Sequence, residues 1–367
     1  MTFGARAVIR LGALKKNLRV IQGAVPGAKV MAVIKANAYG HGMVTVAKSL
    51  HDVDAFAVAR LSEARRLRES GIDKPIVLLA GVLTSTDLSE AMLHGFEIVV
   101  HCAEQIKMLE TAGTGTATVW LKIDTGMNRL GFSPDDCSGL IGRLRDCDRV
   151  EEVRLMSHLA SADELDNSTT EDQFALFRSV VEGFSGAVSI ANTPATLGWP
   201  QIVNARELLG FEGEHWIRPG LALFGISPFS GQTGADFGLT SVMQFEARLI
   251  AIKTLRAGAR VGYKGQYQSQ SESVLGIIAA GYGDGYSRHF RNGTPVLING
   301  RRVPLIGNVS MDLIAVDLGS SAADKVGDMA TLWGAGLAVE EIAPWADAIP
   351  YELVCGVMHR EAVAVVD

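Results

Sequence analysis

The sequence predicts an α/β protein in which an N-terminal (β/α)8 barrel of the TIM type precedes a C-terminal domain made mostly of β-strands. From residue 30 to about residue 226, short apolar runs alternate with amphipathic segments, as in repeated βα units around a parallel sheet. Residues 227–238 are small, polar and turn-forming, and the alternation stops after them. We therefore assign residues 1–231 to the barrel and residues 232–367 to the second domain.

Eight apolar runs are the candidate barrel strands, because they lack polar alternation, as strands buried on both faces do. They are residues 30–34, 55–59, 75–80, 97–101, 118–124, 153–158 and 187–192, with 216–226 as the eighth. Helices are predicted between them, for example near residues 42–50 and in LSEARRLRESG, where Gly71 is a stop signal. The length is sufficient for such a barrel, which needs about 200 residues or more.

The second domain is predicted from strand-like runs without intervening helices. These are VMQFEARLIAI, SVLGIIAAG and TPVLINGRRVPLIG. In the last of them Asn299-Gly300 separates two apolar runs, which is a strong signal for a β-hairpin. GYGDGY (281–286) does not fit a dinucleotide-binding turn, because Tyr286 occupies the position of the third glycine and no βαβ unit follows. We interpret it as a turn or as a functional loop of another kind.

Composition limits the classes of partner. The 367 residues include 34 Lys plus Arg and 40 Asp plus Glu, a net charge of -6, and without a basic run a nucleic-acid partner is not expected. No stretch approaches 18 uninterrupted apolar residues and the first residues lack the apolar core of a secretion signal, so we expect a cytoplasmic protein without membrane contact. The four cysteines lack CxxC spacing and the histidines lack paired spacing, so neither disulfides nor a metal site are expected.

Polar residues gather where the predicted barrel strands end, and barrel enzymes carry their reactive groups there. These residues are Lys35, Lys122, Asp124, His158, Asn192, Thr193 and Arg218. A lysine after an apolar run either extends into solvent or is held dry and used as an amine. Because Lys35 converges with the other polar residues, we favour the interpretation that its amine is held dry and used chemically.

Two of these residues indicate the kind of ligand. Arg218 can donate hydrogen bonds but neither accepts them nor releases its proton, so it would bind a carboxylate, a phosphate or an unprotonated ring nitrogen. Thr193, with Gly220-Leu221 later in the chain, offers donors to a phosphate. Thr193 could equally cap a helix that begins at Pro194, and the two roles are compatible.

Several motifs occur in a fixed order: AVIKANAYGHG, KIDTGMNRLGF, MSHLA, ANT, WIRPGLALFG, VGYKG, AAGYGDGY and NVSMD. Together they resemble the alanine racemase family of pyridoxal 5'-phosphate enzymes, from about residue 6 to the C-terminus. The resemblance implies a racemase that interconverts L-alanine and D-alanine by a two-base mechanism, either to supply D-alanine for peptidoglycan or to catabolise alanine. It also implies an amino-acid substrate and a homodimer with shared active sites.

The resemblance also assigns roles to residues. Lys35 would carry the cofactor as an imine and, with Tyr263, act as a catalytic acid or base. The cofactor would be bound by Tyr39, Asn192, Thr193, Gly220 and Leu221, by Arg218 at the pyridine nitrogen, by His158 between Arg218 and Tyr263, and by Arg129 at the phenolic oxygen. The substrate would meet Arg129, the Met311 backbone, Tyr282 and Asp312.

Three positions leave questions open. Lys122 corresponds to a lysine that is carbamylated in some relatives, but an unmodified lysine could instead form an ion pair with Asp124. Thr193 stands where many relatives have serine, which preserves the hydroxyl. His359, four residues after Cys355, stands where many relatives have a tyrosine that contacts the phosphate and the entrance.

Other functions were weighed against the racemase. A decarboxylase of the same barrel group would need a reactive cysteine in a glycine-rich motif, and Cys355, interpreted as lying on an apolar strand, fits this poorly. A non-catalytic carrier of pyridoxal phosphate would need Lys35 but neither Tyr263 nor a second domain. A racemase of broader specificity, acting for example on serine, is a further alternative, because sequence does not define the width of the pocket.

Overall fold

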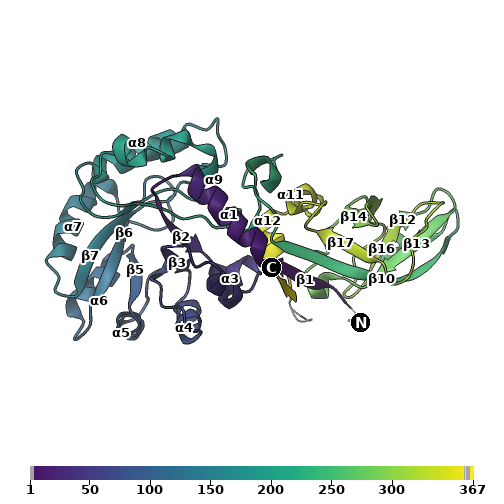
Figure 1. Ribbon diagram of the computed structural model, residues 1–367, viewed down its shortest axis with the longest axis horizontal. Helices are drawn as coiled ribbons and strands as arrows, with labels where there is room; N and C mark the ends of the chain where they lie inside the picture. Colours follow the sequence, from purple (N-terminus) through teal and green to yellow (C-terminus); the bar gives the residue numbers. More distant parts are fainter. Residues whose placement is uncertain (1–3, 359, 361–363) are drawn as a thin grey trace.

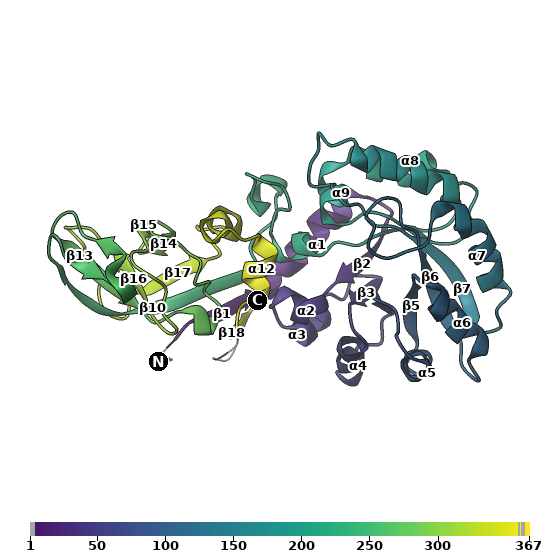
Figure 2. The same cartoon turned by 180° about the vertical axis from the view of Figure 1, so that it is seen from behind.

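The computed structural model describes residues 4–358, 360 and 364–367. A closed barrel and a second, mostly β-stranded domain lie side by side along the long axis, with β1, α1 and β10 running between them (Figures 1 and 2). The barrel consists of eight parallel strands: β2 (Lys29–Val33), β3 (Ala55–Val58), β4 (Ile76–Leu78), β5 (Phe96–Val100), β6 (Ala117–Lys122), β7 (Val150–Met156), β8 (Val188–Ser189) and β9 (His215–Ile217).

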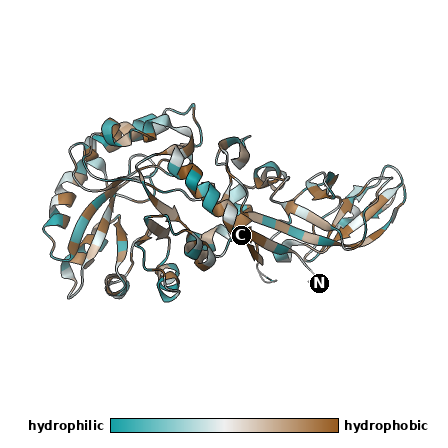
Figure 3. Cartoon of the chain, in the orientation of Figure 1, coloured by the Kyte–Doolittle hydropathy of each residue, from teal (hydrophilic) through white to brown (hydrophobic). Residues whose placement is uncertain are grey.

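Helices surround the barrel strands and cover their outer face (Figures 1 and 2). They are α1 (Leu11–Ala24), α3 (Met43–Ser49), α4 (Leu61–Glu69), α5 (Ser85–Leu93), α6 (Ala103–Thr111), α7 (Cys137–Arg145), α8 (Thr169–Val181), α9 (Thr193–Gly198) and α10 (Ala205–Leu209). The short element α2 (Lys35–Tyr39) has left-handed backbone geometry and follows β2 directly. Most strand positions are buried and apolar, with charged residues in β7 as an exception, whereas the helices alternate between hydrophobic and hydrophilic residues (Figure 3). This difference is the amphipathic pattern from which the barrel was predicted, and the prediction is confirmed.

The second domain is built around an eight-stranded sheet. Its elements are β10 (Met243–Leu255), β13 (Ser273–Ile278), β14 (Pro295–Ile298), β15 (Arg301–Pro304), β16 (Ile314–Asp317), β17 (Met329–Trp333) and β18 (Ala364–Val366), with the small pair β11 (Arg260–Val261) and β12 (Tyr267–Gln268) and the short helices α11 (Val339–Ile342) and α12 (Pro350–Cys355). The predicted hairpin is confirmed: Ile298 pairs with Arg301, and Asn299 and Gly300 have φ of 48° and 75°, as a tight hairpin turn requires.

The strand β1 (Arg6–Arg10) belongs to this second sheet, although it precedes the barrel in the chain. It pairs antiparallel with β10, with Ala7 opposite Phe245, and parallel with β18. The predicted boundary at residue 231 therefore places β1 with the barrel, whereas β1 pairs with strands of the second domain. Pairing over such a separation closes the sheet around both ends of the chain and fixes the second domain against the barrel.

Two local predictions were wrong. The eighth barrel strand ends at Ile217, and Leu221–Phe224 form a 3-10 helix instead of continuing the strand. Cys355 ends the helix α12 instead of lying on a strand, because Pro350 starts a helix at its first position. His359 lies outside the described residues. Among the described helices, none combines the length and the apolar character needed to cross a membrane.

Candidate active site

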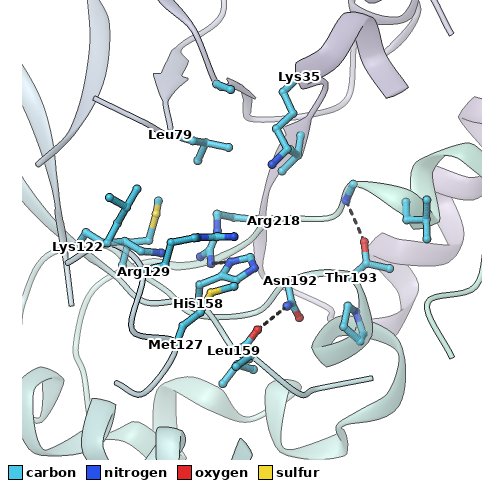
Figure 4. Close-up of a pocket in the computed structure, with 18 of the residues that line it drawn as sticks. Lys35, Leu79, Lys122, Met127, Arg129, His158, Leu159, Asn192, Thr193 and Arg218 are labelled. Carbon is cyan, nitrogen blue, oxygen red and sulfur yellow. Dashed lines mark hydrogen bonds between the residues drawn. The ribbon is translucent and has the colours of Figure 1, made fainter. Parts of the chain in front are cut away.

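The carboxyl ends of the barrel strands surround a cavity of about 440 Å³. Its wall includes all of the barrel residues proposed for the site: Lys35, Tyr39, Lys122, Asp124, Arg129, His158, Asn192, Thr193, Arg218, Gly220 and Leu221. Figure 4 shows the side chains of Lys35, Arg129 and Arg218 directed toward the same space. The residues of the cavity wall proposed for the site lie at or after the ends of five strands, β2, β6, β7, β8 and β9, so closure of the barrel brings them together.

Lys35 begins a turn with unusual backbone geometry. The next four residues, 36–39, all have φ between 50° and 55°, the left-handed region that costs about 1–2 kcal/mol for each L-residue. Neighbouring side chains hold this turn in place, and the Glu63 carboxylate accepts a hydrogen bond of 2.7 Å from the Ala36 N–H. Strain of this kind concentrates at functional sites. The turn at residues 36–39 reverses the chain directly after β2 and leaves Lys35 at the cavity.

The cavity contains four cationic side chains. The pKa of Lys35 is lowered by burial and then by the charge of Arg129. Burial, followed by the charges of Arg218 and Arg129, lowers the pKa of Lys122 to about 7. Lys122 is therefore partly neutral near pH 7, and the shift at Lys35 likewise favours the neutral, nucleophilic form of its amine. The cavity wall thus contains more basic side chains than carboxylates, which come from Asp124 and Asp163, and the pKa of both of its amines is lowered.

Arg218 is buried, and both of its terminal nitrogens have hydrogen-bond partners. Its guanidinium donates hydrogen bonds to the Ser189 hydroxyl (2.5 Å) and to the carbonyls of Ser157 (2.5 Å) and Ile190 (3.3 Å). It also lies 3.3 Å from Nδ1 of His158. Burial lowers the pKa of Arg218 to about 9, so the group remains a cation at neutral pH. Arg218 is therefore a fixed donor whose position is set by the strands β7 and β8.

His158 is neutral in this arrangement. Burial, and after it the charge of Arg218, lowers the pKa of the imidazole well below its usual value. Because Nδ1 accepts a hydrogen bond from Arg218, the proton of the neutral ring resides on Nε2. Arg218 therefore donates to His158, and His158 in turn presents a neutral Nε2–H that can donate to a further group.

A group of small and hydroxyl-bearing residues forms a cup on the opposite side of the cavity. The Thr193 hydroxyl accepts a hydrogen bond of 2.9 Å from the Gly220 N–H (Figure 4). A side chain at Gly220 would lie 2.5 Å from the Tyr39 hydroxyl, so glycine keeps this cup open. Thr193 is not the helix cap: α9 begins at Thr193, and the Asn192 side chain accepts the capping hydrogen bond from Ala195. The Thr193 hydroxyl is consequently directed to the cup.

Asp124 does not form an ion pair with Lys122. Its carboxylate accepts hydrogen bonds from the N–H groups of Gly126 and Asn128, both 3.0 Å, and thereby closes the loop that carries Arg129. Within the described part of the chain, the Lys122 amine forms no hydrogen bond or ion pair, and the charges of Arg218 and Arg129 act on it. The role of Asp124 is thus to shape the loop that returns Arg129 to the cavity.

The site residues proposed from the second domain do not line this cavity. Tyr263 is 70% exposed and Met311 is 54% exposed, and Tyr282 is also exposed. The Asp312 carboxylate accepts a hydrogen bond of 2.7 Å from Arg360, which also contacts Asp284. These residues form a separate, exposed group on the second domain, and the chain does not bring them to its own barrel.

Some residues of the cavity were missed by the sequence reasoning. Tyr351 of α12 lines it, as does Asp163, and Ser157 and Ser189 hold Arg218. Ser189 interrupts an apolar run, which is a signal that could have drawn attention to it. Tyr351 gave no signal, because its approach to the cavity depends on how the second domain packs against the barrel.

The cavity fits pyridoxal phosphate by the chemistry of its donors. An amine at Lys35 can bind an aldehyde, and the buried guanidinium of Arg218 can donate to a ring nitrogen. The cup at Gly220 leaves room for a phosphate among hydroxyl and backbone groups, in a cavity whose potential is positive. The four cations would otherwise repel one another, so an anionic ligand complements them.

Comparison with known proteins gives a consistent result along the whole chain. The family models for the N-terminal and C-terminal domains of alanine racemase match residues 9–228 and 242–365. Similar proteins include the alanine racemases of Vibrio atlanticus (46% identity over 98% of both chains) and Vibrio parahaemolyticus (47% identity over 97% of both). The crystal structure of the biosynthetic alanine racemase from Pseudomonas aeruginosa superposes with a TM-score of 0.93, at 36% identity and full coverage of both chains.

Proposed function

The chain belongs to the alanine racemase family, and on that premise we propose that Lys35 and Tyr263 exchange protons with opposite faces of the substrate. The protein is a pyridoxal 5'-phosphate enzyme that interconverts L-alanine and D-alanine. This identity over nearly the full chain does not favour a decarboxylase or a non-catalytic carrier of the cofactor. The observation that carries the assignment of residues is the amine of Lys35 in a cavity walled by donors and cations.

The cofactor would be held by residues of one barrel. Lys35 would bind its aldehyde carbon, Arg218 would donate to its ring nitrogen, and Tyr39, Thr193 and Gly220 would surround its phosphate, with Asn192 and Leu221 beside them. When bound, the cofactor stabilises negative charge at the substrate Cα and so makes the Cα proton removable. Arg129, which enters the cavity on its own loop, would pair with the substrate carboxylate.

Two proton carriers are needed because racemisation removes a proton from one face and returns one to the other. Lys35 would hold one proton at Nζ, where its lowered pKa favours the neutral, accepting form. Tyr263 would hold the other at Oη, and the Nε2–H of His158 would stabilise the oxygen when it has lost its proton. The Arg218–His158 contact supports this role, since it fixes the tautomer of the ring.

Arg218 also limits side reactions. A guanidinium does not transfer its proton, so Arg218 would donate a hydrogen bond to the ring nitrogen of the cofactor and leave it unprotonated. The cofactor would then disperse the negative charge of the substrate less, which would favour return of a proton to Cα. This supports racemisation over transamination, in which a proton is added at a different carbon.

Lys122 is proposed to be carbamylated. The lowered pKa of about 7 leaves much of the amine neutral near pH 7, and a neutral amine adds to CO₂ to give a carbamate anion and one released proton. The resulting anion would be attracted to the adjacent cations Arg129 and Arg218, whereas the ammonium is repelled by them. Mass spectrometry of the intact protein in bicarbonate and in carbonate-free buffer tests this, since the carbamate adds one CO₂ to the chain.

We further propose a homodimer in which each active site is shared. The support is the exposure of Tyr263 and Met311 and their absence from the cavity of their own barrel. In a two-fold dimer, Tyr263 of the partner subunit would meet His158, and its Tyr282, Met311 and Asp312 would approach the substrate. We also propose a cytoplasmic location, supported by four unpaired cysteines. We propose the domain boundary between residues 231 and 232, which is supported by its position between the two family-model matches.

Mixing two inactive variants tests the shared site. Lys35→Ala and Tyr263→Phe chains are each expected to be inactive, and subunit exchange between them should produce heterodimers with one intact site. Random exchange of equal amounts restores roughly a quarter of the wild-type sites. If both residues acted within one chain, every site would keep one lesion and no activity would return, although exchange could be verified by mass spectrometry.

A second experiment tests Lys35 and the substrate. Borohydride should fix the cofactor to the peptide that contains Lys35, and Lys35→Ala should lose this labelling. A panel of L-amino acids assayed for D-products then separates alanine from serine and longer side chains. Labelling of another peptide in the Lys35→Ala variant would show that the assignment is wrong.

A further inference from the structure

The helix α12 of the second domain packs against the strained turn that follows Lys35, at the place where the two domains meet (Figure 1). A side chain at Gly40 would lie 2.1 Å from the carbonyl oxygen of Val354, so the two backbones are already in contact. The turn itself has left-handed geometry at residues 36–39 and needs support from its surroundings. The helix α12 is one source of this support, although it belongs to the other domain.

Tyr351 is the side chain of α12 that reaches the cavity. Its ring lies 6.0 Å from the ring of Tyr39 at an interplanar angle of 47°, and Phe224 approaches the same ring at 5.2 Å and 44°. Tyr39 thus contacts two aromatic side chains in tilted arrangements of the kind that stabilise aromatic pairs. Of these two neighbours, Phe224 comes from the barrel and Tyr351 from the second domain.

Tyr351 is suited to hold Tyr39 and not to exchange protons. Burial raises the pKa of Tyr351 to about 12, so its hydroxyl stays protonated and neutral at physiological pH. Burial also raises the pKa of Tyr39 above its ordinary value. Both hydroxyls can therefore donate hydrogen bonds to an anion, but the hydroxyl beside Gly220 belongs to Tyr39.

We propose that Tyr351 is a positioning residue that presses the Tyr39 ring against Phe224 and so keeps the Tyr39 hydroxyl at Gly220, in the cup assigned to the cofactor phosphate. This inference rests on the proposed function of Tyr39 as a phosphate contact. It extends that function, because it makes cofactor affinity depend on a residue of the second domain of the same chain. Without Tyr351, the Tyr39 ring has a free face and its hydroxyl loses its fixed position.

The test compares binding of two probes to the apo-protein. Pyridoxal 5'-phosphate reports on the cup, whereas pyridoxal lacks the phosphate and reports only on Lys35 and the ring contacts. Tyr351→Ala should weaken binding of pyridoxal 5'-phosphate by about two- to tenfold, the range expected for the loss of an aromatic pair, and leave binding of pyridoxal unchanged. Tyr351→Phe is the matched control, because it keeps the ring and removes only the hydroxyl, and it should bind both probes as the wild type does.

Three outcomes would overturn the inference. Unchanged affinity of Tyr351→Ala for pyridoxal 5'-phosphate would show that Tyr351 does not contribute to cofactor binding. Equal weakening of both probes would show that the substitution damages the fold in general and not the phosphate cup. A loss of affinity in Tyr351→Phe as large as that in Tyr351→Ala would show that the hydroxyl, not the ring, is responsible.

The variant Tyr39→Phe separates this inference from the function on which it rests. If Tyr39 contacts the phosphate, Tyr39→Phe alone weakens binding of pyridoxal 5'-phosphate, and adding Tyr351→Ala to it produces little further loss. Full affinity in Tyr39→Phe would contradict the phosphate role of Tyr39 itself. A normal effect of Tyr39→Phe with additive loss in the double variant would preserve that role and reject Tyr351 as the residue acting through it.

Discussion

Gly40 offers a direct measurement of how closely the second domain holds the turn after Lys35. Gly40 has φ of 79°, and alanine at this position would incur the left-handed cost of about 1–2 kcal/mol. The added methyl group would also lie 2.1 Å from the Val354 carbonyl oxygen, whereas carbon and oxygen normally stay about 3.3 Å apart. Relief of this overlap requires a displacement of more than about 1 Å between α12 and the turn.

The expected destabilisation of Gly40→Ala is the sum of these two effects. Overpacking of a closed contact costs about 1–3 kcal/mol, so the total is about 2–5 kcal/mol. Gly71 provides a matched control, because it also follows a helix with positive φ (83°) but would place a methyl group in open space. Gly71→Ala should therefore lower the free energy of unfolding by only about 1–2 kcal/mol.

The assay is urea unfolding of the apo-protein at one fixed protein concentration, because subunit association would otherwise shift the midpoint. The two variants should keep the wild-type slope and differ in midpoint. Gly40→Ala should in addition weaken binding of pyridoxal 5'-phosphate, since the displaced turn carries Lys35 and Tyr39, whereas Gly71→Ala should not. Equal midpoints for the two variants would refute the reasoning, because the contact with Val354 would then cost nothing.

Three other changes have defined outcomes. Arg218→Glu should lower the ratio of racemisation to transamination, because a carboxyl group can share a proton with the ring nitrogen of the cofactor; an unchanged product ratio would contradict this. In carbonate-free buffer, Lys122 binds fewer protons in the folded than in the unfolded state between its folded pKa of about 7 and the ordinary value of about 10.5, so stability should rise with pH across that window by at most about 1.4 kcal/mol per unit. Lys122→Met should flatten this rise, and an identical slope in the variant would assign it to other groups. Tyr286 is buried and its hydroxyl has no partner among the described residues, so Tyr286→Phe should raise the free energy of unfolding by about 1 kcal/mol, and a lower urea midpoint would indicate an undetected hydrogen bond.

Much of the barrel was predictable because its strands carry local signals. Runs such as 30–34 and 55–59 are apolar at every position, which indicates burial on both faces wherever the strands lie in space. The hairpin at Asn299-Gly300 was predictable for the same reason, since the two residues favour positive φ without help from the rest of the fold. The polar residues at the strand ends followed once the barrel was assumed, because parallel strands bring their carboxyl ends to one rim.

The features that were missed depend on contacts between distant parts of the chain. Residues 36–39 have no glycine, and of these four only Asn37 adopts left-handed geometry readily; the turn is held by Glu63 and by α12. The strand β1 pairs with residues that follow it by more than half the chain, so its own sequence does not distinguish the two domains. The local sequence does not predict the roles of Tyr263 and Met311 either, because in the shared site proposed above these roles depend on a second subunit.

The charge of the cavity links cofactor, substrate and proton transfer. The pKa of Lys35 is lowered by burial and by the charge of Arg129. A substrate carboxylate that pairs with Arg129 offsets the second of these causes, while burial of the amine remains. Lys35 is therefore a weaker base in the empty cavity and becomes a stronger one when a carboxylate is bound, so the amine accepts a proton most readily when a substrate is present to give one. The Asp124 carboxylate contributes to this coupling through the backbone, because its hydrogen bonds with Gly126 and Asn128 close the loop that carries Arg129 to the cavity.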